Sequence, residues 1–188
     1  MRSQYAFSLV ELSIVLVILG LLIGGILGGQ ALIRAAELRA VSTEYSRWIT
    51  ATQTFRDKYF AIPGDMSNAT AFWGKDAAAC NGDSGSVGAP GTCNGNGNGT
   101  LAGGAASASV ESTQYWKQLA LAGLIEGNYS GLNGPTPSGS LHAVIGTNVP
   151  RSRVSNLGWT AHTWTGTGNA EMWATGQNGN VFYLGGQH

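Results

Sequence analysis

The stretch FSLVELSIVLVILGLLIGGILGG, at residues 7–29, decides the fold, and Glu11 is its only charged residue. As a helix rising about 1.5 Å per residue, it covers roughly 30–35 Å, enough to cross the hydrocarbon core of a bilayer. A carboxylate at the centre of a membrane costs about 2.5–3.5 kcal/mol on insertion scales. A helix that served only as a membrane anchor would gain nothing from this unfavourable charge. We therefore expect Glu11 to have a partner that neutralises it.

The residues before this stretch offer one. Residues 1–6, MRSQYA, are polar and carry Arg2. Cleavage between Ala6 and Phe7 would create an α-amine one helical turn from Glu11. That cation would neutralise Glu11 in its own chain or, with staggered packing, in a neighbouring chain.

The segment AFSLVELSIVLVILGLLIGG, at residues 6–25, resembles the N-terminal signature of type IV pilins and type II secretion pseudopilins. The resemblance implies that residues 1–6 are a leader, that a prepilin peptidase cuts between Ala6 and Phe7, that Phe7 is N-methylated, and that Glu11 governs assembly. Ala6 departs from the glycine usual before the cut. The alternative is an ordinary signal anchor or signal peptide, although a signal peptide usually has a shorter apolar core.

Glycines recur every four residues in the span, at Gly20, Gly24 and Gly28. One interpretation is a surface for close helix–helix approach. The other is a weak segment of helix, because each glycine costs about 1 kcal/mol relative to alanine. The resemblance to pilins implies that this region can extend or melt in a filament. Both interpretations stay open.

Beyond the span, residues 30–60 are expected to continue the helix in amphipathic form. Their apolar seam steps by three and four residues: Leu38, Val41, Tyr45, Trp48, Thr52, Phe55 and Tyr59. The Pro63-Gly64 pair is expected to end the helical region, and Phe72 and Trp73 to be core anchors.

Residues 61–188 are expected to form one globular head with a Gly/Asn-rich surface loop at 75–109. A second helix is predicted at 110–126, with Gly127 as its stop. Strands are predicted at 141–145, 155–165, 170–175 and 181–184, with Asn178-Gly179 as a turn pairing the last two. The resemblance implies an α+β, type IV pilin-like fold, with the long helix packed against a small antiparallel sheet.

Two cysteines, Cys80 and Cys93, lie within the predicted loop. Behind an export segment, they favour a disulfide that closes the loop, with two free thiols as the alternative.

The same loop resembles the first part of an EF-hand calcium loop. The candidate ligands are Asn94, Asn96, Asn98 and Thr100, with Gly99 sixth and Leu101 eighth, and Glu111 closing a longer loop. The pattern departs from an EF-hand because its side chains are neutral and its twelfth residue is Ala105. A weak calcium site therefore competes with a plain cluster of Asn-Gly turns.

Charge and motif content argue against two classes of function, nucleic-acid binding and catalysis. The net charge is zero, so constitutive nucleic-acid binding is not expected. His142, His162 and His188 have no ligand spacing, and no catalytic motif is present, so an enzyme is not predicted.

The predicted function is a structural subunit of a type IV pilus or pseudopilus, with other pilins and the inner membrane as partners. The alternative is a minor pilin or tethered head that binds surfaces, glycans or DNA through Trp159, Trp164, Trp173, Arg151 and Arg153. The resemblance places the N-terminus in the cytoplasm and the head in the periplasm, reaching the cell surface or periplasm in the filament.

Overall fold

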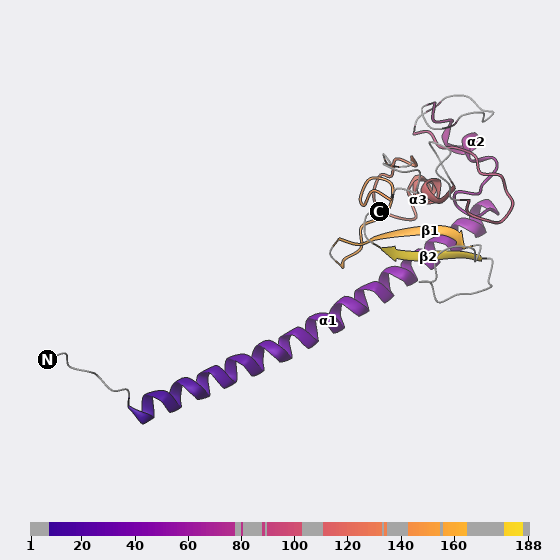
Figure 1. Cartoon of the computed structure of the whole chain (residues 1–188). Helices are drawn as coiled ribbons and strands as arrows, with labels where there is room; N and C mark the ends of the chain where they lie inside the picture. Colours follow the sequence, from indigo (N-terminus) through magenta and orange to yellow (C-terminus); the bar gives the residue numbers. More distant parts are fainter. Residues whose placement is uncertain are drawn as a thin grey trace. The chain divides into compact units, whose positions relative to one another are not determined.

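The computed structural model describes residues 8–77, 80, 88, 90–102, 111–132, 134, 143–154, 156–164 and 179–185. Its elements, in chain order, are α1 (Leu9–Tyr59), α2 (Ala69–Trp73), α3 (Glu111–Leu121), β1 (Gly158–Trp164) and β2 (Gly179–Gly185) (Figure 1). The long apolar helix and the small antiparallel sheet give the α+β, pilin-like fold that the sequence predicts. The chain forms two compact units, Met1–Ala40 and Val41–His188.

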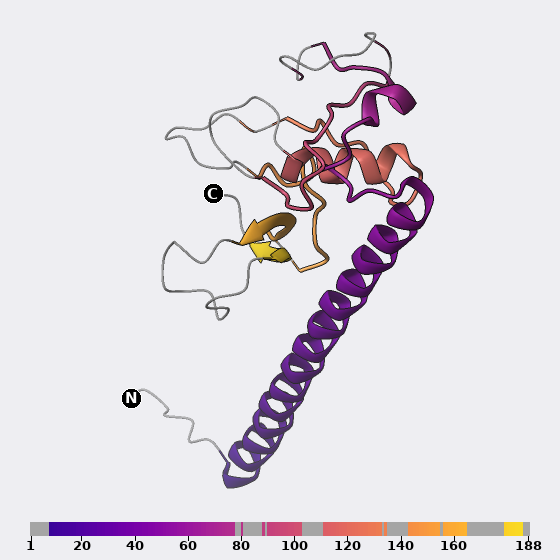
Figure 2. The same ribbon diagram turned by 90° about the vertical axis from the view of Figure 1, so that its right-hand side faces the viewer.

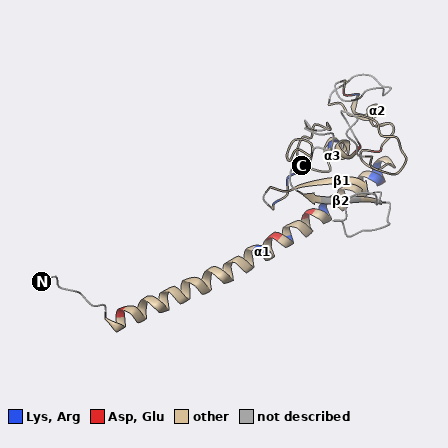
Figure 3. Cartoon of the chain, viewed as in Figure 1, with Lys and Arg blue, Asp and Glu red and all other residues tan. Residues whose placement is uncertain are grey.

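The described part of the first unit is the N-terminal portion of α1. All its large apolar side chains from Leu9 to Leu27 are between 47% and 82% exposed. Residues 12–33 carry no charge, which Figure 3 shows as a long tan stretch of α1. Among the described elements, α1 is the helix long and apolar enough to cross a membrane.

In the second unit α1 becomes amphipathic. Its buried residues, Glu44, Trp48, Ala51 and Phe55, step by four, three and four and therefore lie on one face. The predicted seam is confirmed at Trp48 and Phe55, with Val41 and Tyr59 partly buried against the same core. It is wrong at Leu38, which is 72% exposed and belongs to the first unit.

The helix ends where a left-handed residue breaks it. Phe60 has φ of 54°, and its N–H still donates to the Arg56 carbonyl at 2.8 Å. The break thus precedes Pro63-Gly64. Of the two predicted anchors, Trp73 packs against the core, whereas Phe72 is 55% exposed.

The centre of the second unit is α3, which lies beside the last turns of α1 (Figure 2). Trp116 is fully buried and meets Trp48 edge-to-face, with ring centroids 5.3 Å apart. Nine of the eleven α3 residues are buried, including Gln114 and Gln118. Gln118 accepts from Gly64 N at 2.6 Å, and its amide group donates to the Cys93 carbonyl at 3.0 Å.

The predicted end of this helix is wrong. The helix stops at Leu121, because Gly123 adopts φ of 72°. Gly123 N donates to Ala120 O at 2.9 Å and Leu124 N to Leu119 O at 3.0 Å, the bonds of a Schellman motif. Gly123, rather than Gly127, is the stop.

Within the described residues the sheet has two antiparallel strands, with Gly158 opposite Gly185 and Trp164 opposite Gly179. Trp159 and Ala161, two residues apart on β1, are both buried, as expected for one face of a strand. Gly179, predicted in a turn, is the first residue of β2. Residues 143–145 of the predicted strand at 141–145 form only an isolated bridge, between Ile145 and Val149. The predicted strand at 170–175 lies outside the described residues.

The buried Glu44 carboxylate connects α1 to the region around β1. Its Oε2 accepts from Ser152 Oγ at 2.7 Å and from Trp159 Nε1 at 2.8 Å, and its Oε1 accepts from Arg153 N at 2.7 Å. These three bonds join residues more than 100 positions apart in the chain.

Glu44→Ala should destabilise the second unit, because it leaves three donors without their acceptor. The expected loss is about 2–4 kcal/mol in the free energy of unfolding. Urea unfolding of the full chain in detergent, followed by tryptophan fluorescence, measures it. Glu37→Ala, at an exposed carboxylate of the same helix, is the control. Equal stability of the two variants would contradict the role of Glu44.

Candidate functional site

Glu11 lies in the first turn of α1. Its Oε2 accepts a hydrogen bond from the backbone N–H of Ser8 at 2.8 Å, and Ser8 Oγ accepts from Val10 N at 3.4 Å. Ala6 and Phe7, the predicted cleavage pair, lie outside the described residues.

The two bonds are a variant of the capping box, with Ser8 as the residue before the helix. Glu11 satisfies the Ser8 amide as in the usual box, whereas Ser8 Oγ accepts from the amide of Val10 rather than from that of Glu11. A carboxylate is also favoured at a helix N-terminus by the helix dipole. The sequence analysis missed this role, although the Ser8-x-x-Glu11 spacing is its usual signal. The Ser8 amide belongs to the Phe7–Ser8 peptide bond, so a cut between Ala6 and Phe7 would leave it intact.

Comparison with known families gives the class of this segment. Residues 1–27 match the family model described as the prokaryotic N-terminal methylation motif. This is the leader motif of type IV pilins and pseudopilins, so it supports a type IV pilin-like or pseudopilin subunit, a kind of structural protein. The match covers the first 27 of 188 residues. No curated protein and no solved structure matches the chain.

The predicted disulfide is present between Cys80 and Cys93, whose Cα atoms lie 5.3 Å apart. Closing a loop of this size contributes about 3 kcal/mol in the chain-entropy model. Both cysteines are buried, as are Thr92 and Leu101. The prediction that 75–109 is only a surface loop is therefore wrong for its described parts, which supply core residues.

The predicted calcium ligands lie in a series of turns. Asn96 Oδ1 accepts from Asn98 N at 2.9 Å, and Asn98 Oδ1 accepts from Thr100 N at 2.8 Å and from Thr100 Oγ1 at 2.6 Å. Asn94 Oδ1 accepts from Thr70 N at 2.9 Å. These side-chain oxygens thus bind the protein's own donors, as asparagine does in turns.

Two buried carboxylates hold this segment. Glu111 Oε1 accepts from Asn96 N at 2.9 Å, and its Oε2 accepts from Ala102 N at 2.7 Å. Asp65 Oδ1 accepts from Asn98 N at 3.1 Å, and its Oδ2 accepts from Gly99 N at 2.7 Å. We call residues 94–102 with these two carboxylates the carboxylate-held loop.

Glu111 is therefore brought to the asparagine segment, as the sequence analysis expected, but it binds backbone amides there. Asp65 was missed, and no local pattern marks it, because it reaches the loop from more than 30 residues away. Within the described ranges, no group of three or more His, Cys, Asp or Glu side chains is placed to hold a metal. Calcium binding stays a prediction.

The remaining candidates divide between the core and the surface. Trp159 is buried and bonds Glu44, so it is a core residue rather than a stacking platform. Arg151 and Arg153 are exposed. His162 lies on β1, where burial lowers its pKa. His142, His188, Trp173 and the Trp164 side chain lie outside the described parts.

The carboxylate-held loop predicts which amides lose protection when each acid is changed. Glu111→Gln should accelerate hydrogen exchange at Asn96 and Ala102, and Asp65→Asn should do so at Asn98 and Gly99, because each change removes a carboxylate acceptor. We expect at least a tenfold faster exchange at the affected pair, measured by NMR on the full chain. Asp57→Asn, at an exposed carboxylate, is the control. Identical exchange in all variants would contradict the assignment.

Proposed function

We propose that this chain is a structural subunit that polymerises through α1 after its leader is removed before Phe7. The observation that carries the proposal is the N-terminal methylation motif at residues 1–27. The motif ends within the uncharged stretch 12–33 of α1, and the large apolar side chains of α1 up to Leu27 are exposed. In a membrane, lipid would cover that surface. In a filament, neighbouring copies of the same helix would cover it.

The glycines of α1 support close contact between such helices. A Cβ atom added at Gly20, Gly24 or Gly28 would meet nothing within 4 Å in this chain. The open strip beside these residues leaves room for a neighbouring backbone, as at small-residue interfaces in membranes.

Glu11 is proposed to register one subunit against the next. Its Oε2 is held by the Ser8 amide. Among the described residues, no donor binds its Oε1, which leaves that atom for the α-amine of Phe7 in the same or a neighbouring chain. The capping box would then orient the carboxylate, and the amine would neutralise it in the apolar surroundings.

The proposed partners are a prepilin peptidase, other pilins and the inner membrane, with the N-terminus in the cytoplasm and the head in the periplasm. A second candidate is a minor subunit whose head binds a surface, a glycan or DNA. The exposed Arg151 and Arg153 favour it, but buried Trp159 offers no stacking platform. Zero net charge argues against strong binding to phosphates.

The registration role predicts an assembly defect without an insertion defect. Glu11→Gln should enter the membrane as the wild type does and reduce the yield of sheared filaments at least tenfold, because the amine loses its counter-charge. Immunoblots of membrane and sheared fractions measure both quantities. The matched control is Glu37→Gln, an exposed carboxylate of the same helix. Wild-type filament yield from Glu11→Gln would refute the role.

Leader removal predicts a defined N-terminus. Mass spectrometry of the native protein should find a chain that begins at N-methylated Phe7. Ala6→Gly should be processed at least as well, whereas Ala6→Leu should accumulate uncut chain, since the position before the cut is small. A native chain that retains Met1 would contradict the proposal and leave a plain signal anchor.

A further inference from the structure

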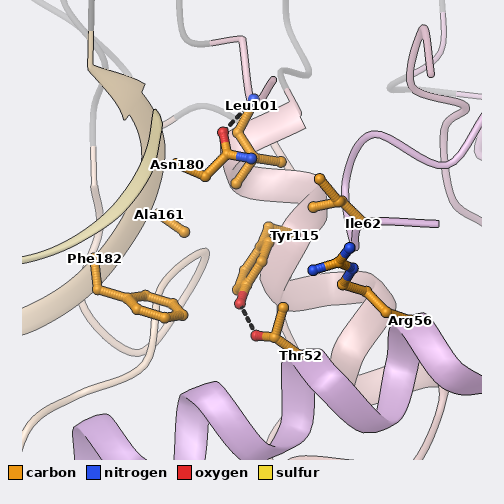
Figure 4. A pocket seen from close by; sticks show the side chains of 8 residues that line it. All are labelled: Thr52, Arg56, Ile62, Leu101, Tyr115, Ala161, Asn180 and Phe182. Carbon is orange, nitrogen blue, oxygen red and sulfur yellow. Dashed lines mark hydrogen bonds between the residues drawn. The ribbon is translucent and has the colours of Figure 1, made fainter. Parts of the chain in front are cut away.

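The second unit contains a cavity of about 150 Å³ between α1, α3 and the sheet (Figure 4). Its walls are mainly apolar and include Ile62, Leu101, Ala161, Phe182 and the ring of Tyr115. A cavity of this volume with such walls is large enough for a benzene-sized body.

The neutral polar groups in the wall are already bonded within the protein. Asn180 Oδ1 accepts from Leu101 N at 2.9 Å and from the Thr163 hydroxyl, and its Nδ2 donates to Gly99 O at 2.9 Å. Thr52 Oγ1 donates to Trp48 O at 2.7 Å, and the Tyr115 hydroxyl is bonded to Thr52. Burial raises the pKa of Tyr115, so its hydroxyl stays neutral.

Arg56 is the charged member of the lining. Figure 4 shows its guanidinium group extended from α1 toward Ile62 and Tyr115, on the side of the cavity. Arg56 and Asn180 are the exposed lining residues, so the cavity meets solvent beside them. Among the described residues, no carboxylate is paired with Arg56. Asp57 lines a separate, neighbouring depression with Arg56 and forms no ion pair with it there.

A guanidinium group that pairs with no carboxylate of the described residues, at the mouth of an apolar cavity, is suited to an anion attached to an apolar body. Arginine presents a planar fork that matches a carboxylate. We propose that this cavity binds a small organic carboxylate with an apolar body of about six carbons, the carboxylate against Arg56 and the body between Leu101, Ala161 and Phe182. These lining residues are distinct from the apolar, glycine-containing part of α1 up to residue 33 that is proposed for assembly.

The test uses the full chain in lipid nanodiscs, with empty nanodiscs as a blank. The probe is 4-fluorobenzoate, titrated by ¹⁹F NMR, and 4-fluorobenzamide is its neutral counterpart of the same shape. Saturable binding of the benzoate is expected, at least tenfold tighter than that of the benzamide. Binding that does not saturate, or an equal affinity for both probes, would overturn the proposal.

Two variants separate the charge from the cavity. Arg56→Gln should weaken benzoate binding about tenfold, the effect of one charge-assisted contact, and leave benzamide binding unchanged. Lys58→Gln, a cation on the same helix outside the cavity, is the control and should change neither. Unchanged benzoate binding in Arg56→Gln would refute the contact.

Ala161→Leu fills the cavity from β1 and should abolish binding of both probes. Circular dichroism and tryptophan fluorescence establish whether the variant is folded. Because overpacking can itself unfold a core, Ala161→Val is the second variant. It should weaken both probes at least fivefold, and wild-type binding by a folded Ala161→Val would place the ligand elsewhere and overturn the proposal.

Discussion

Backbone amides in irregular segments that are at least partly buried are the constraint on which the second unit depends. Its described sheet has two strands, so many N–H groups in its loops have no ladder partner, and buried donors without acceptors are costly. Side chains supply the acceptors instead. Glu44 binds the Arg153 amide, Glu111 and Asp65 bind the carboxylate-held loop, and Gln118 binds the Gly64 amide.

This constraint explains why α3 is polar yet buried. A helix surface with Gln114 and Gln118 would normally face solvent. Here the side-chain amides of both residues form hydrogen bonds with the surrounding loops instead. Gln114 Oε1 accepts from the Thr92 hydroxyl at 2.9 Å, and Gln114 Nε2 donates to Gly131 O at 2.9 Å. Lys117 likewise pairs with Asp76 at 2.7 Å. The side chains of α3 therefore supply the hydrogen bonds that hold the surrounding loops, a role that neighbouring strands fill in a larger sheet.

Sequence patterns predicted the features that depend on local chemistry. The apolar stretch, the seam at Trp48 and Phe55 and the cysteine pair follow from periodicity, composition and spacing. The strands expected at 155–165 and 181–184 are present as β1 and β2 with shifted bounds, and their pairing with each other was not predicted. Features that depend on distant partners did not follow. Asp65 accepts from amides of the carboxylate-held loop that lie more than 30 residues away in the sequence. No sequence pattern around Glu44 predicts its hydrogen bond with Trp159.

Some local signals were present but competed with one another. Gly123 and Gly127 both offered a helix stop, and only the Schellman bonds to Leu119 and Ala120 decide between them. Gly179 suited a turn by its type, yet pairing with Trp164 makes it part of a strand. At the N-terminus, the Ser8-x-x-Glu11 spacing indicates a helix cap, but the sequence analysis interpreted Glu11 only as an assembly residue. Glu11 caps the first turn of the helix and is also the candidate for assembly.

The Cys80–Cys93 disulfide makes the final packing of the second unit depend on the redox state of its compartment. Cys93 follows Thr92, whose hydroxyl donates to Gln114 of α3, and Gln118 binds the Cys93 carbonyl. Disulfides persist in oxidising compartments and are rare where thiols are kept reduced. With the head in the periplasm, as proposed above, a newly made chain would complete the packing around α3 only after export. In that proposal, oxidation and leader removal are two separate chemical marks of a finished subunit, one on each side of the membrane.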